Sequence, residues 1–335
     1  MQLVLDTNGL VVKQRKRCFQ IIGKEQQRLI SPEKVTSIAV TADCLLSSAA
    51  IRLAVEHGIP IYFFGPTGKM EGKLWSPHFV GLASLRRAQA LWLESPDCLP
   101  WAAKLAEKKT VRQAGHLQEL HRLLGSSDEL AAGMAILENQ RADMFKAGET
   151  PHDPERLRGR LMGLEGSAAK GYWAALAAAA PEHWRFAGRS RRPAQDPFNA
   201  ALNYLYGMLY PVVEGAVFAA GLDPYMGVLH AEEYDRPALT YDMIEPFRPW
   251  VDALLLDLCR EDALDLRHFE PRDGGWWVGK AAKAVLIPRF NDFLLGERTE
   301  DGERRSVRNH IHAYAGALAE LLRAWYDQRQ ATLLP

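Results

Sequence analysis

Residues 161–180 read LMGLEGSAAKGYWAALAAAA, and this stretch gives the clearest indication of the fold. It fits one long helix, and its alanines give that helix a narrow profile. Because short side chains let neighbouring helices approach closely, a helix over residues 164–180 can lie tight against its neighbours. Glu165 is the one acidic residue of the stretch. We therefore expect the packing to bring the Glu165 carboxylate deep into a helical bundle.

Two later fragments contain the other chemically distinctive side chains. LHA contains a lone imidazole, His230, and YDMIEPFRP contains Asp242 and Glu245. Two carboxylates with an imidazole form a ligand set for Mg²⁺ or Mn²⁺, and the imidazole shifts the expectation somewhat toward Mn²⁺. Taken singly, Glu165 is more typical of a solvated helix start, His230 of a hydrogen-bonded surface histidine and Glu245 of a cap. They indicate a metal site only jointly, through their order and the sequence around them.

The third ligand has two candidates. Asp242 and Glu245 are three residues apart and would share one helical face, so either could reach the ion. Pro246 disfavours helical geometry at the residue before it, which predicts that Glu245 lies at a helix start or a kink.

The sequence around these residues resembles a known family. Four segments, in their order along the chain, resemble the CRISPR-associated integrase/endonuclease family, the metal-dependent spacer-acquisition subunit of CRISPR adaptation. They are LMGLEGSAAKGYW, DPFNAALNYLYGMLY, GVLH and YDMIEPFRPWVD. The resemblance is strongest from Gly163 to Asp252 and continues more weakly through the first 90 residues. It implies that Glu165, His230 and Glu245 hold the metal. Asp242 then becomes an outer carboxylate or a helix-start cap.

The same resemblance implies the architecture and the reaction. It implies an α+β protein with a small β-sandwich-like N-terminal domain that forms a homodimer, followed by a larger all-helical C-terminal domain with the metal site. A 3′ hydroxyl of a captured DNA fragment with 3′ overhangs would attack a phosphodiester at a CRISPR repeat, with Mg²⁺ or Mn²⁺ as cofactor. The implied partners are DNA, a second copy of the chain and a small ferredoxin-like CRISPR adaptation subunit.

Two other functions use the same residues differently. The first is a metal-dependent nuclease that acts on branched or single-stranded DNA in repair, without integration. The second is a noncatalytic DNA-binding scaffold, in which the acidic residues merely organise a helix bundle. Strand joining separates integration from repair, and metal titration separates both enzymes from the scaffold.

The chain changes character near residue 80. Before it, short segments rich in Val, Ile and Phe predict strands, with one helix among them; after it, long helices are predicted. We therefore place an N-terminal β-rich dimerisation domain at residues 1–80 and a helical catalytic domain at residues 81–335. The expected strands are 2–12, 18–22, 35–40 and 59–64 with a helix over 47–55, and the later helices are 85–93, 100–124, 127–147, 161–180, 199–220, 249–258 and 307–330.

Composition restricts the remaining options. The chain has 335 residues, of which 47% are hydrophobic and 24% charged, as expected for a globular protein with two cores. Its 41 basic and 41 acidic residues argue against a surface coated with positive charge for nonspecific DNA binding. The four cysteines form no paired spacing, and neither a signal peptide nor a membrane-spanning stretch is visible. We expect a cytoplasmic protein without a membrane role.

Two further residues are candidates for the catalytic site, and a third is a candidate for DNA binding. Tyr172 lies two helical turns after Glu165, so its hydroxyl could meet the substrate or the metal shell, with buried packing as the alternative. Asn203 lies inside an otherwise apolar helix, where we expect its amide to hydrogen-bond near the site. Arg248 follows the acidic motif and could bind a phosphate or balance Glu245.

Local basic groups are candidates for DNA binding. Arg189, Arg191 and Arg192 belong to a predicted loop that precedes DPFNA, where DNA contact competes with a simple solvated loop. Lys280 and Lys283 follow a turn and a pair of tryptophans, which could hold a strand end by stacking and charge or could belong to the core.

Overall fold

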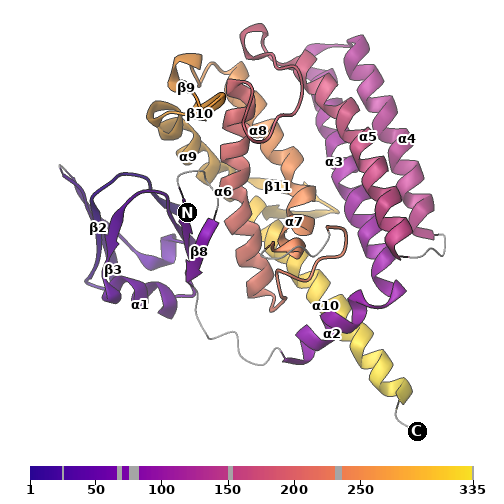
Figure 1. The fold of residues 1–335 in the computed structure, drawn as a ribbon, viewed down its shortest axis with the longest axis horizontal. Coiled ribbons are helices and arrows are strands. Elements are labelled where there is room, and N and C mark those ends of the chain that lie inside the picture. The colour runs from indigo at the N-terminus through magenta and orange to yellow at the C-terminus, as the bar shows by residue number, and fades with distance from the viewer. Residues whose placement is uncertain (25, 66–69, 75–82, 150–153, 231–235, 334–335) are drawn as a thin grey trace. The chain divides into compact units, whose positions relative to one another are not determined.

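The computed structural model describes residues 1–335 except 25, 66–69, 75–82, 150–153, 231–235 and 334–335. The chain divides into two compact units (Figure 1). The first unit comprises Met1–Leu82 together with Asn291–Asn309, and the second comprises Ala83–Phe290 together with His310–Pro335. The sequence pattern does not predict that residues 291–309 belong to the first unit. The assignment of residues 1–80 to dimerisation and 81–335 to catalysis stays a prediction.

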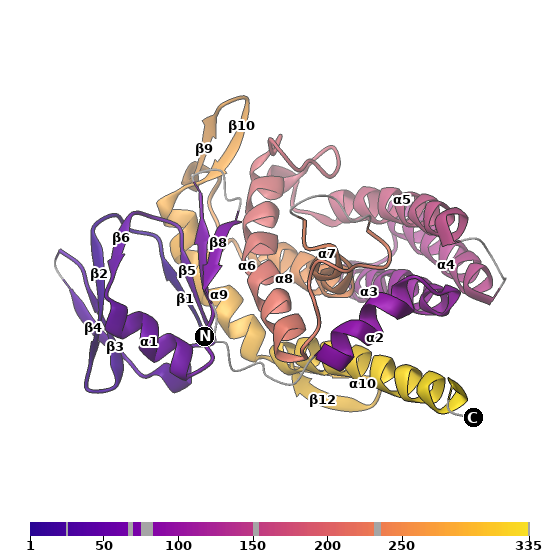
Figure 2. The same ribbon diagram turned by 60° about the horizontal axis from the view of Figure 1, so that its bottom comes forward.

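The first unit contains two four-stranded sheets (Figure 2). One has the order β1-β5-β7-β8, in which β8 is the single antiparallel strand. The other has the order β4-β3-β2-β6, in which β2 pairs antiparallel with β3 and parallel with β6. The strands are β1 Gln2–Leu5, β2 Leu10–Arg15, β3 Cys18–Ile22, β4 Gln27–Ile30, β5 Ser37–Val40, β6 Cys44–Leu46, β7 Ile61–Phe64 and β8 Met70–Leu74.

Both sheets contribute to one hydrophobic core, so the predicted sandwich-like arrangement is confirmed. Leu5 and Ile38 from one sheet and Val12 and Phe19 from the other are buried in it, with Leu53 from helix α1 (Ser48–Glu56). The side chain of Ser47 caps this helix by accepting a hydrogen bond from the Ala50 amide at 3.2 Å.

The single strand expected over residues 2–12 is wrong, because the chain leaves one sheet and enters the other within it. Gly9 has φ +82°, a left-handed conformation that glycine adopts without a Cβ penalty. The break at Gly9 therefore separates β1 from β2.

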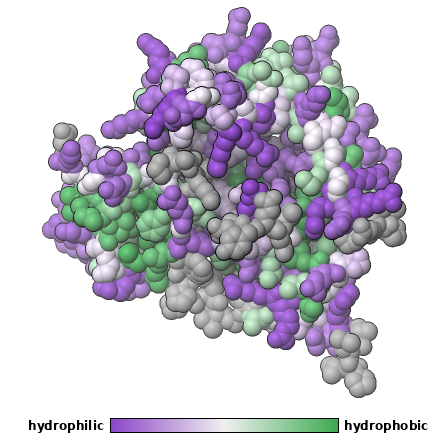
Figure 3. Space-filling view, in the orientation of Figure 1, coloured by the Kyte–Doolittle hydropathy of each residue, from purple (hydrophilic) through white to green (hydrophobic). Residues whose placement is uncertain are grey.

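The first unit also exposes large apolar side chains on its second sheet. Leu29 in β4 is 52% exposed and Leu45 in β6 is 70% exposed. On the side of the molecule seen in Figure 3, hydrophobic residues gather over the region formed by the N-terminal strands and α1. Exposed apolar patches of this kind are typical of interaction surfaces.

In the second unit, α3 (Leu99–Leu124), α4 (Asp128–Glu149) and α5 (Pro154–Ala179) lie side by side (Figures 1 and 2). The predicted close packing of the alanine-rich helix is confirmed at Gly133 of α4. A Cβ added at Gly133 would lie 2.7 Å from the Cβ of Ala175 in α5, closer than two carbon atoms can approach. The pair of small residues therefore lets these helices approach more closely than larger side chains would allow.

The remaining helices of the chain follow the predicted positions, with two additions. The helices are α2 Ala83–Leu93, α6 Pro197–Ala219, α7 Ala238–Ile244, α8 Arg248–Arg260, α9 Lys280–Leu295 and α10 Val307–Leu333. Helices α7 and α9 are absent from the predicted set. Within the described residues, no helix has both the length and the apolar character needed to span a bilayer.

The α+β class is confirmed, but the region after residue 80 is not entirely helical. It contains two antiparallel hairpins, β9–β10 (Phe269–Arg272 and Gly275–Val278) and β11–β12 (Glu297–Glu300 and Glu303–Ser306). Each turns through an Asp-Gly pair with positive φ at both residues, 52° and 72° in the first and 52° and 79° in the second. Asp-Gly is a strong signal for a tight hairpin turn, and its two occurrences explain why the helical prediction fails there.

Candidate metal centre

Two of the three predicted ligands converge on a buried lysine. Lys109 of α3 places its Nζ 2.5 Å from Glu165 Oε1 on α5 and 2.6 Å from Glu245 Oε2. Lys109 is 8% exposed and Glu245 is 3% exposed, so these charges are largely removed from water. Burial opposes the Lys109 charge, but Glu245 and Glu165 outweigh it and raise the pKa of the ammonium. The site is therefore built around a cation held by two carboxylates.

The other oxygen of Glu245 faces a second cation. Arg248 Nη1 lies 2.6 Å from Glu245 Oε1, and the guanidinium lies 5.0 Å from the ring centroid of Tyr206. Burial alone would raise the pKa of the Glu245 carboxyl, but Arg248, Lys109 and His230 lower it to about 2. Glu245 is thus an anion at any physiological pH.

The turn that carries Glu245 continues the helix instead of breaking it. Glu245 has φ −54° and ψ −47°, and it opens a 3₁₀ turn (Glu245–Phe247) between α7 and α8. Glu245 therefore lies at the start of a helical turn, as predicted, although its own backbone angles are helical, and Pro246 marks the change from α to 3₁₀ geometry. Arg112 of α3 fastens this turn by donating from Nη1 to the Pro246 carbonyl at 2.6 Å. Its guanidinium also lies 3.9 Å from the ring centroid of Trp250.

Asp242 is committed to the chain around His230. Its Oδ2 accepts from the amides of Val228 at 2.5 Å and Leu229 at 3.0 Å, and its Oδ1 accepts from the His230 amide at 2.9 Å. The same Oδ1 lies 2.8 Å from Nδ1 of the His230 ring. Asp242 is fully buried, so these four donors use both of its oxygens. Of the two candidates, Glu245 is therefore the one whose oxygens could hold an ion.

This arrangement also determines which nitrogen of His230 is available. Since the Asp242 carboxylate only accepts hydrogen bonds, Nδ1 carries the proton and Nε2 keeps its lone pair in the neutral ring. Burial opposes the protonation of His230, but the hydrogen bond and charge of Asp242, together with Glu245 and Glu165, raise the pKa of the imidazole. The three predicted ligands thus lie within electrostatic range of one another.

Two side chains from other helices hold the segment that leads to His230. Gln89 of α2 donates to the carbonyls of Asp223 at 2.9 Å and Met226 at 3.0 Å. Arg158 of α5 donates to the Val228 carbonyl at 3.0 Å. The position of the imidazole therefore depends on α2 and α5 as well as on Asp242.

The residues suit a hard divalent cation, although they do not enclose one as they stand. In the described part of the chain, no three His, Cys, Asp or Glu side chains are close enough together to hold an ion. The fit lies in the donors: two carboxylates that already face one cationic atom, and an imidazole whose outer nitrogen is oriented by a carboxylate. Glu245 Oε2 is buried, and the ammonium of Lys109 faces it at 2.6 Å. The assignment of Glu165, His230 and Glu245 as ligands stays a prediction.

Tyr172 is buried, and its hydroxyl is bound by a carboxylate outside the predicted ligand set. It is fully inaccessible, and its hydroxyl donates to Asp252 Oδ2 at 3.0 Å and lies 2.8 Å from His116 Nδ1. Tyr206 donates to the other oxygen of Asp252. Burial raises the pKa of the Asp252 carboxyl to about 6, because the two tyrosines and nearby cations offset only part of that effect. The geometry thus supports the packing alternative for Tyr172.

Asn203 binds the basic loop. Its Oδ1 accepts from Arg189 Nη2 at 2.6 Å, and its Nδ2 donates to the Arg191 carbonyl at 2.5 Å. Arg189 also donates to Asn199 at 2.9 Å, and its guanidinium lies 5.4 Å from the ring centroid of Tyr206. Arg189 therefore acts inside the protein, as the anchor of its loop.

The other predicted DNA-binding residues remain accessible. Arg191, Arg192 and Lys280 are exposed, and Lys283 is half-buried with its Nζ 5.8 Å from the ring centroid of Tyr204. Their role in DNA binding stays a prediction.

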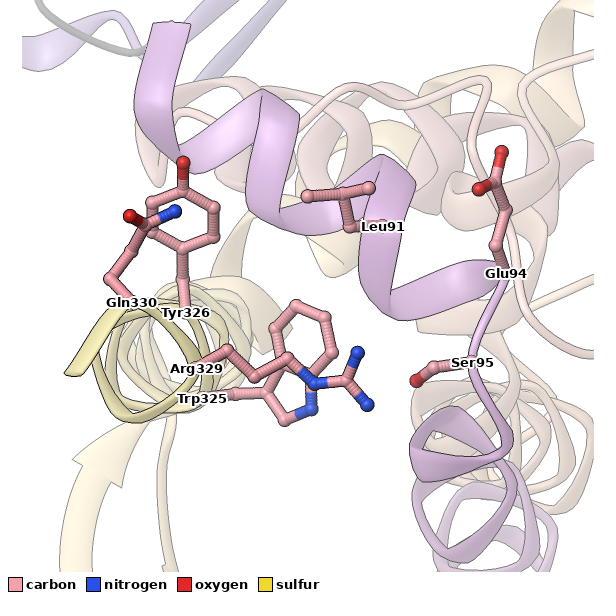
Figure 4. Close-up of a pocket in the computed structure, with 7 residues that line it drawn as sticks. All are labelled: Leu91, Glu94, Ser95, Trp325, Tyr326, Arg329 and Gln330. Carbon is pink, nitrogen blue, oxygen red and sulfur yellow. The ribbon is translucent and has the colours of Figure 1, made fainter. Parts of the chain in front are cut away.

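A pocket of about 370 Å³ lies elsewhere in the second unit, between α2 and the C-terminal part of α10 (Figure 4). Trp325 and Arg329 of α10 line it, and both donate to Asp97, at 2.7 and 3.2 Å. None of the predicted site residues lines this pocket. It therefore gives no support to the metal site.

The sequence interpretation missed Lys109 and Arg112. Both lie on the same face of α3 as the buried Leu105, because they are four and seven positions along the helix from it. Charged residues on an apolar helix face are rarely buried without partners. That pattern was the available signal for both.

Comparison with known proteins gives consistent matches over almost the full length. The sequence pattern of the family described as CRISPR associated protein Cas1 matches residues 3–292. The CRISPR-associated endonuclease Cas1 1 of Archaeoglobus fulgidus is 31% identical, with 96% of each chain covered. A CAS1 protein from Thermotoga maritima has a TM-score of 0.78 at 22% identity, with 96% of each chain covered. A structure described as a casposase bound to integration product has a TM-score of 0.80 at 22% identity, covering 96% of this chain and 90% of that one. At this identity, the two structures establish likeness of fold.

Proposed function

This chain belongs to the Cas1 family of CRISPR-associated proteins, and we propose that it is a divalent-metal-dependent DNA endonuclease and integrase that inserts spacers into a CRISPR array. The family match and the endonuclease name of its 31%-identical relative support the enzyme class. The observation that carries the chemistry is the convergence of Glu165 and Glu245 on one buried cationic atom.

Glu165, Glu245 and Nε2 of His230 would hold Mg²⁺ or Mn²⁺. When bound, such an ion stabilises charge on the phosphate oxygens and eases deprotonation of the attacking hydroxyl. Asp242 keeps the proton of His230 on Nδ1, at 2.8 Å, so that Nε2 can act as a ligand. Arg248 balances Glu245, and its guanidinium would also bind a phosphate oxygen of the DNA.

The proposed reaction is a transesterification. The 3′ hydroxyl oxygen of the fragment forms a bond to a phosphorus atom at the edge of a repeat and gives up its proton. The bond from that phosphorus to the 3′ oxygen of the repeat strand breaks, and the released oxygen takes up a proton. When water is the nucleophile in place of the hydroxyl, the same groups cleave DNA.

We also propose the partners. The DNA substrates are a fragment with 3′ overhangs and a CRISPR repeat, bound in part by the exposed Arg191, Arg192 and Lys280. The exposed Leu29 and Leu45 support an interaction surface on the β-rich unit, where a second copy of the chain would form the homodimer. The small ferredoxin-like adaptation subunit completes the proposed complex.

A strand-joining assay tests this function. A labelled fragment with 3′ hydroxyls is incubated with a repeat-bearing plasmid, Mn²⁺ and the protein, with and without the small adaptation subunit. Joined product is expected, and Glu165→Gln should abolish it, whereas Glu155→Gln on the exposed start of the same helix should leave it unchanged.

Two other outcomes would support the other functions. Cleavage of branched DNA without any joined strand would indicate a repair nuclease. No reaction, together with Mn²⁺ affinity unchanged in both Glu165→Ala and His230→Ala, would indicate a noncatalytic scaffold.

A further inference from the structure

We propose that Lys109 is an internal substitute for the metal: its ammonium occupies the place between Glu165 and Glu245 that the divalent ion takes, and it has to leave for the ion to bind. The inference rests on the proposed function of this site, and it adds a residue that regulates how the site is loaded.

The ammonium and a divalent ion would compete for the same two oxygens. Lys109 Nζ lies 2.5 Å from Glu165 Oε1 and 2.6 Å from Glu245 Oε2. Mg²⁺ binds carboxylate oxygens at about 2.0–2.1 Å, so an ion held by the same oxygens would lie within about 5 Å of the ammonium nitrogen. Like charges at such a separation repel strongly, particularly where water is excluded. Binding of the ion is therefore an exchange of cations on these oxygens.

Lysine is the side chain at this site that can move. Its ammonium is a compact charge on a flexible four-carbon stem, whereas a guanidinium is planar and held in a fixed plane by its partners. Arg248 is held in this way, 2.6 Å from the other oxygen of Glu245 and 5.0 Å from the ring centroid of Tyr206. Lys109 contacts the two oxygens that face each other, and its departure would release both of them.

The exchange explains how two acidic residues stay close together before metal is present. Glu165 and Glu245 would repel each other without a cation between them, and buried carboxylates need a partner. Lys109 supplies that partner and keeps the ligands in position. It does so at a cost in metal affinity, because each arriving ion first has to break two charge pairs.

The test compares Mn²⁺ binding by titration calorimetry and by the loss of the free-ion EPR signal, using the full-length protein. We expect Lys109→Met to bind Mn²⁺ about tenfold more tightly or better, the equivalent of about 1.4 kcal/mol. Lys104→Met removes an exposed lysine from the same helix, and it should bind as the wild type does. The metal-free Lys109→Met protein should melt at a lower temperature than the wild type, and Mn²⁺ should raise its melting temperature by more.

Several outcomes would overturn the proposal. Unchanged or weaker Mn²⁺ affinity in Lys109→Met would mean that the ammonium positions the carboxylates without competing for them. Lys109→Gln provides a second test if the methionine variant does not fold. If both variants fold only when Mn²⁺ is present, that dependence supports the proposal. If neither variant folds even with Mn²⁺, the lysine has a role that an ion cannot replace, and the proposal is wrong.

A further arm separates this inference from the proposed function. The wild type should bind one Mn²⁺ per chain, and Glu165→Gln should lose it. If the wild type binds no ion through Glu165, the proposed function fails. If it does so but Lys109→Met matches it, only the exchange fails.

Discussion

Replacing Asp242 with asparagine should separate the folding role of this residue from its effect on the metal site. The side chain is fully buried, with two donors on each oxygen. Oδ2 receives the Val228 and Leu229 amides, and Oδ1 receives the amide and ring Nδ1 of His230. Asparagine keeps the shape but offers one oxygen and one amino group, so two of the four donors must face an NH₂.

The geometry decides which way the asparagine turns. With its amino group toward Val228 and Leu229, two backbone N–H groups would lose their acceptors. With its amino group toward His230, only the His230 backbone N–H is lost, because the ring can move its proton from Nδ1 to Nε2 and accept at Nδ1. The second orientation is the cheaper one. One unpaired buried N–H costs about 1–3 kcal/mol of unfolding free energy.

The same orientation disables His230 as a ligand, because the proton on Nε2 blocks the nitrogen that would face the ion. Loss of such a supporting carboxylate lowers metal affinity by about 10–100-fold in comparable sites. Urea denaturation measures the first effect, and Mn²⁺ titration of the folded protein measures the second. Asp262→Asn is the control, because Asp262 is exposed and asparagine also tolerates its φ of 52°.

The pH dependence supplies a further readout. Because the pKa of His230 is raised in the folded protein, the stability it contributes is fully present below its unfolded pKa, about 6.5. That contribution is lost as the pH rises through the higher folded value, and Asp242→Asn should remove this loss. Unchanged denaturation midpoint and unchanged Mn²⁺ affinity in the variant would refute the role assigned to Asp242.

Three further predictions concern the framework around the site. Arg112→Met should lower the unfolding free energy by about 2–4 kcal/mol and weaken Mn²⁺ binding, because it removes the bond to the Pro246 carbonyl and the contact with Trp250; an effect no larger than that of the exposed Arg122→Met would contradict it. The folded pKa of about 6 for the Asp252 carboxyl makes the wild type lose stability as the pH rises from 4 to 7, so Asp252→Asn should gain up to about 3 kcal/mol relative to it over that range. Parallel pH profiles of the two proteins in urea denaturation would count against this prediction. Gly133→Ala should destabilise the protein by about 1–3 kcal/mol through its clash with α5, whereas the Cβ of Gly115→Ala would meet nothing within 4 Å and should stabilise the protein by about 0.5–1 kcal/mol. Equal melting temperatures of the two variants would contradict the close approach of α4 and α5.

Much of the helical architecture could be predicted from the sequence, because it depends on local pattern. The alanine-rich helix was expected over residues 161–180 and is found at Pro154–Ala179, and its small side chains do permit the close approach at Gly133. The two Asp-Gly hairpins were not predicted as strands, because each strand has only four residues and those of the second hairpin, β11 and β12, are entirely polar. Short polar segments of this kind give a pattern too weak to separate from a loop.

The site was predictable where one side chain's chemistry decides its role, and less so where tertiary contacts do. The local sequence does not show which of Asp242 and Glu245 is free to bind an ion, because they are acidic residues only three positions apart. In the structure, Glu245 faces a cation, whereas Asp242 accepts four hydrogen bonds. Tyr172 has the spacing to reach the site, but Asp252 draws its hydroxyl into the core. Lys109 acts through residues 56 and 136 positions away, so no local pattern could name its partners.

The most direct measurement is the anomalous difference density of manganese in crystals of the full chain grown with MnCl₂. One strong peak per chain is expected, about 2.0–2.3 Å from an oxygen of Glu165, an oxygen of Glu245 and Nε2 of His230, with Lys109 withdrawn from between the carboxylates. A chain that binds no manganese there under saturating conditions, or that keeps its lysine between the two acids while the ion lies elsewhere, would contradict it.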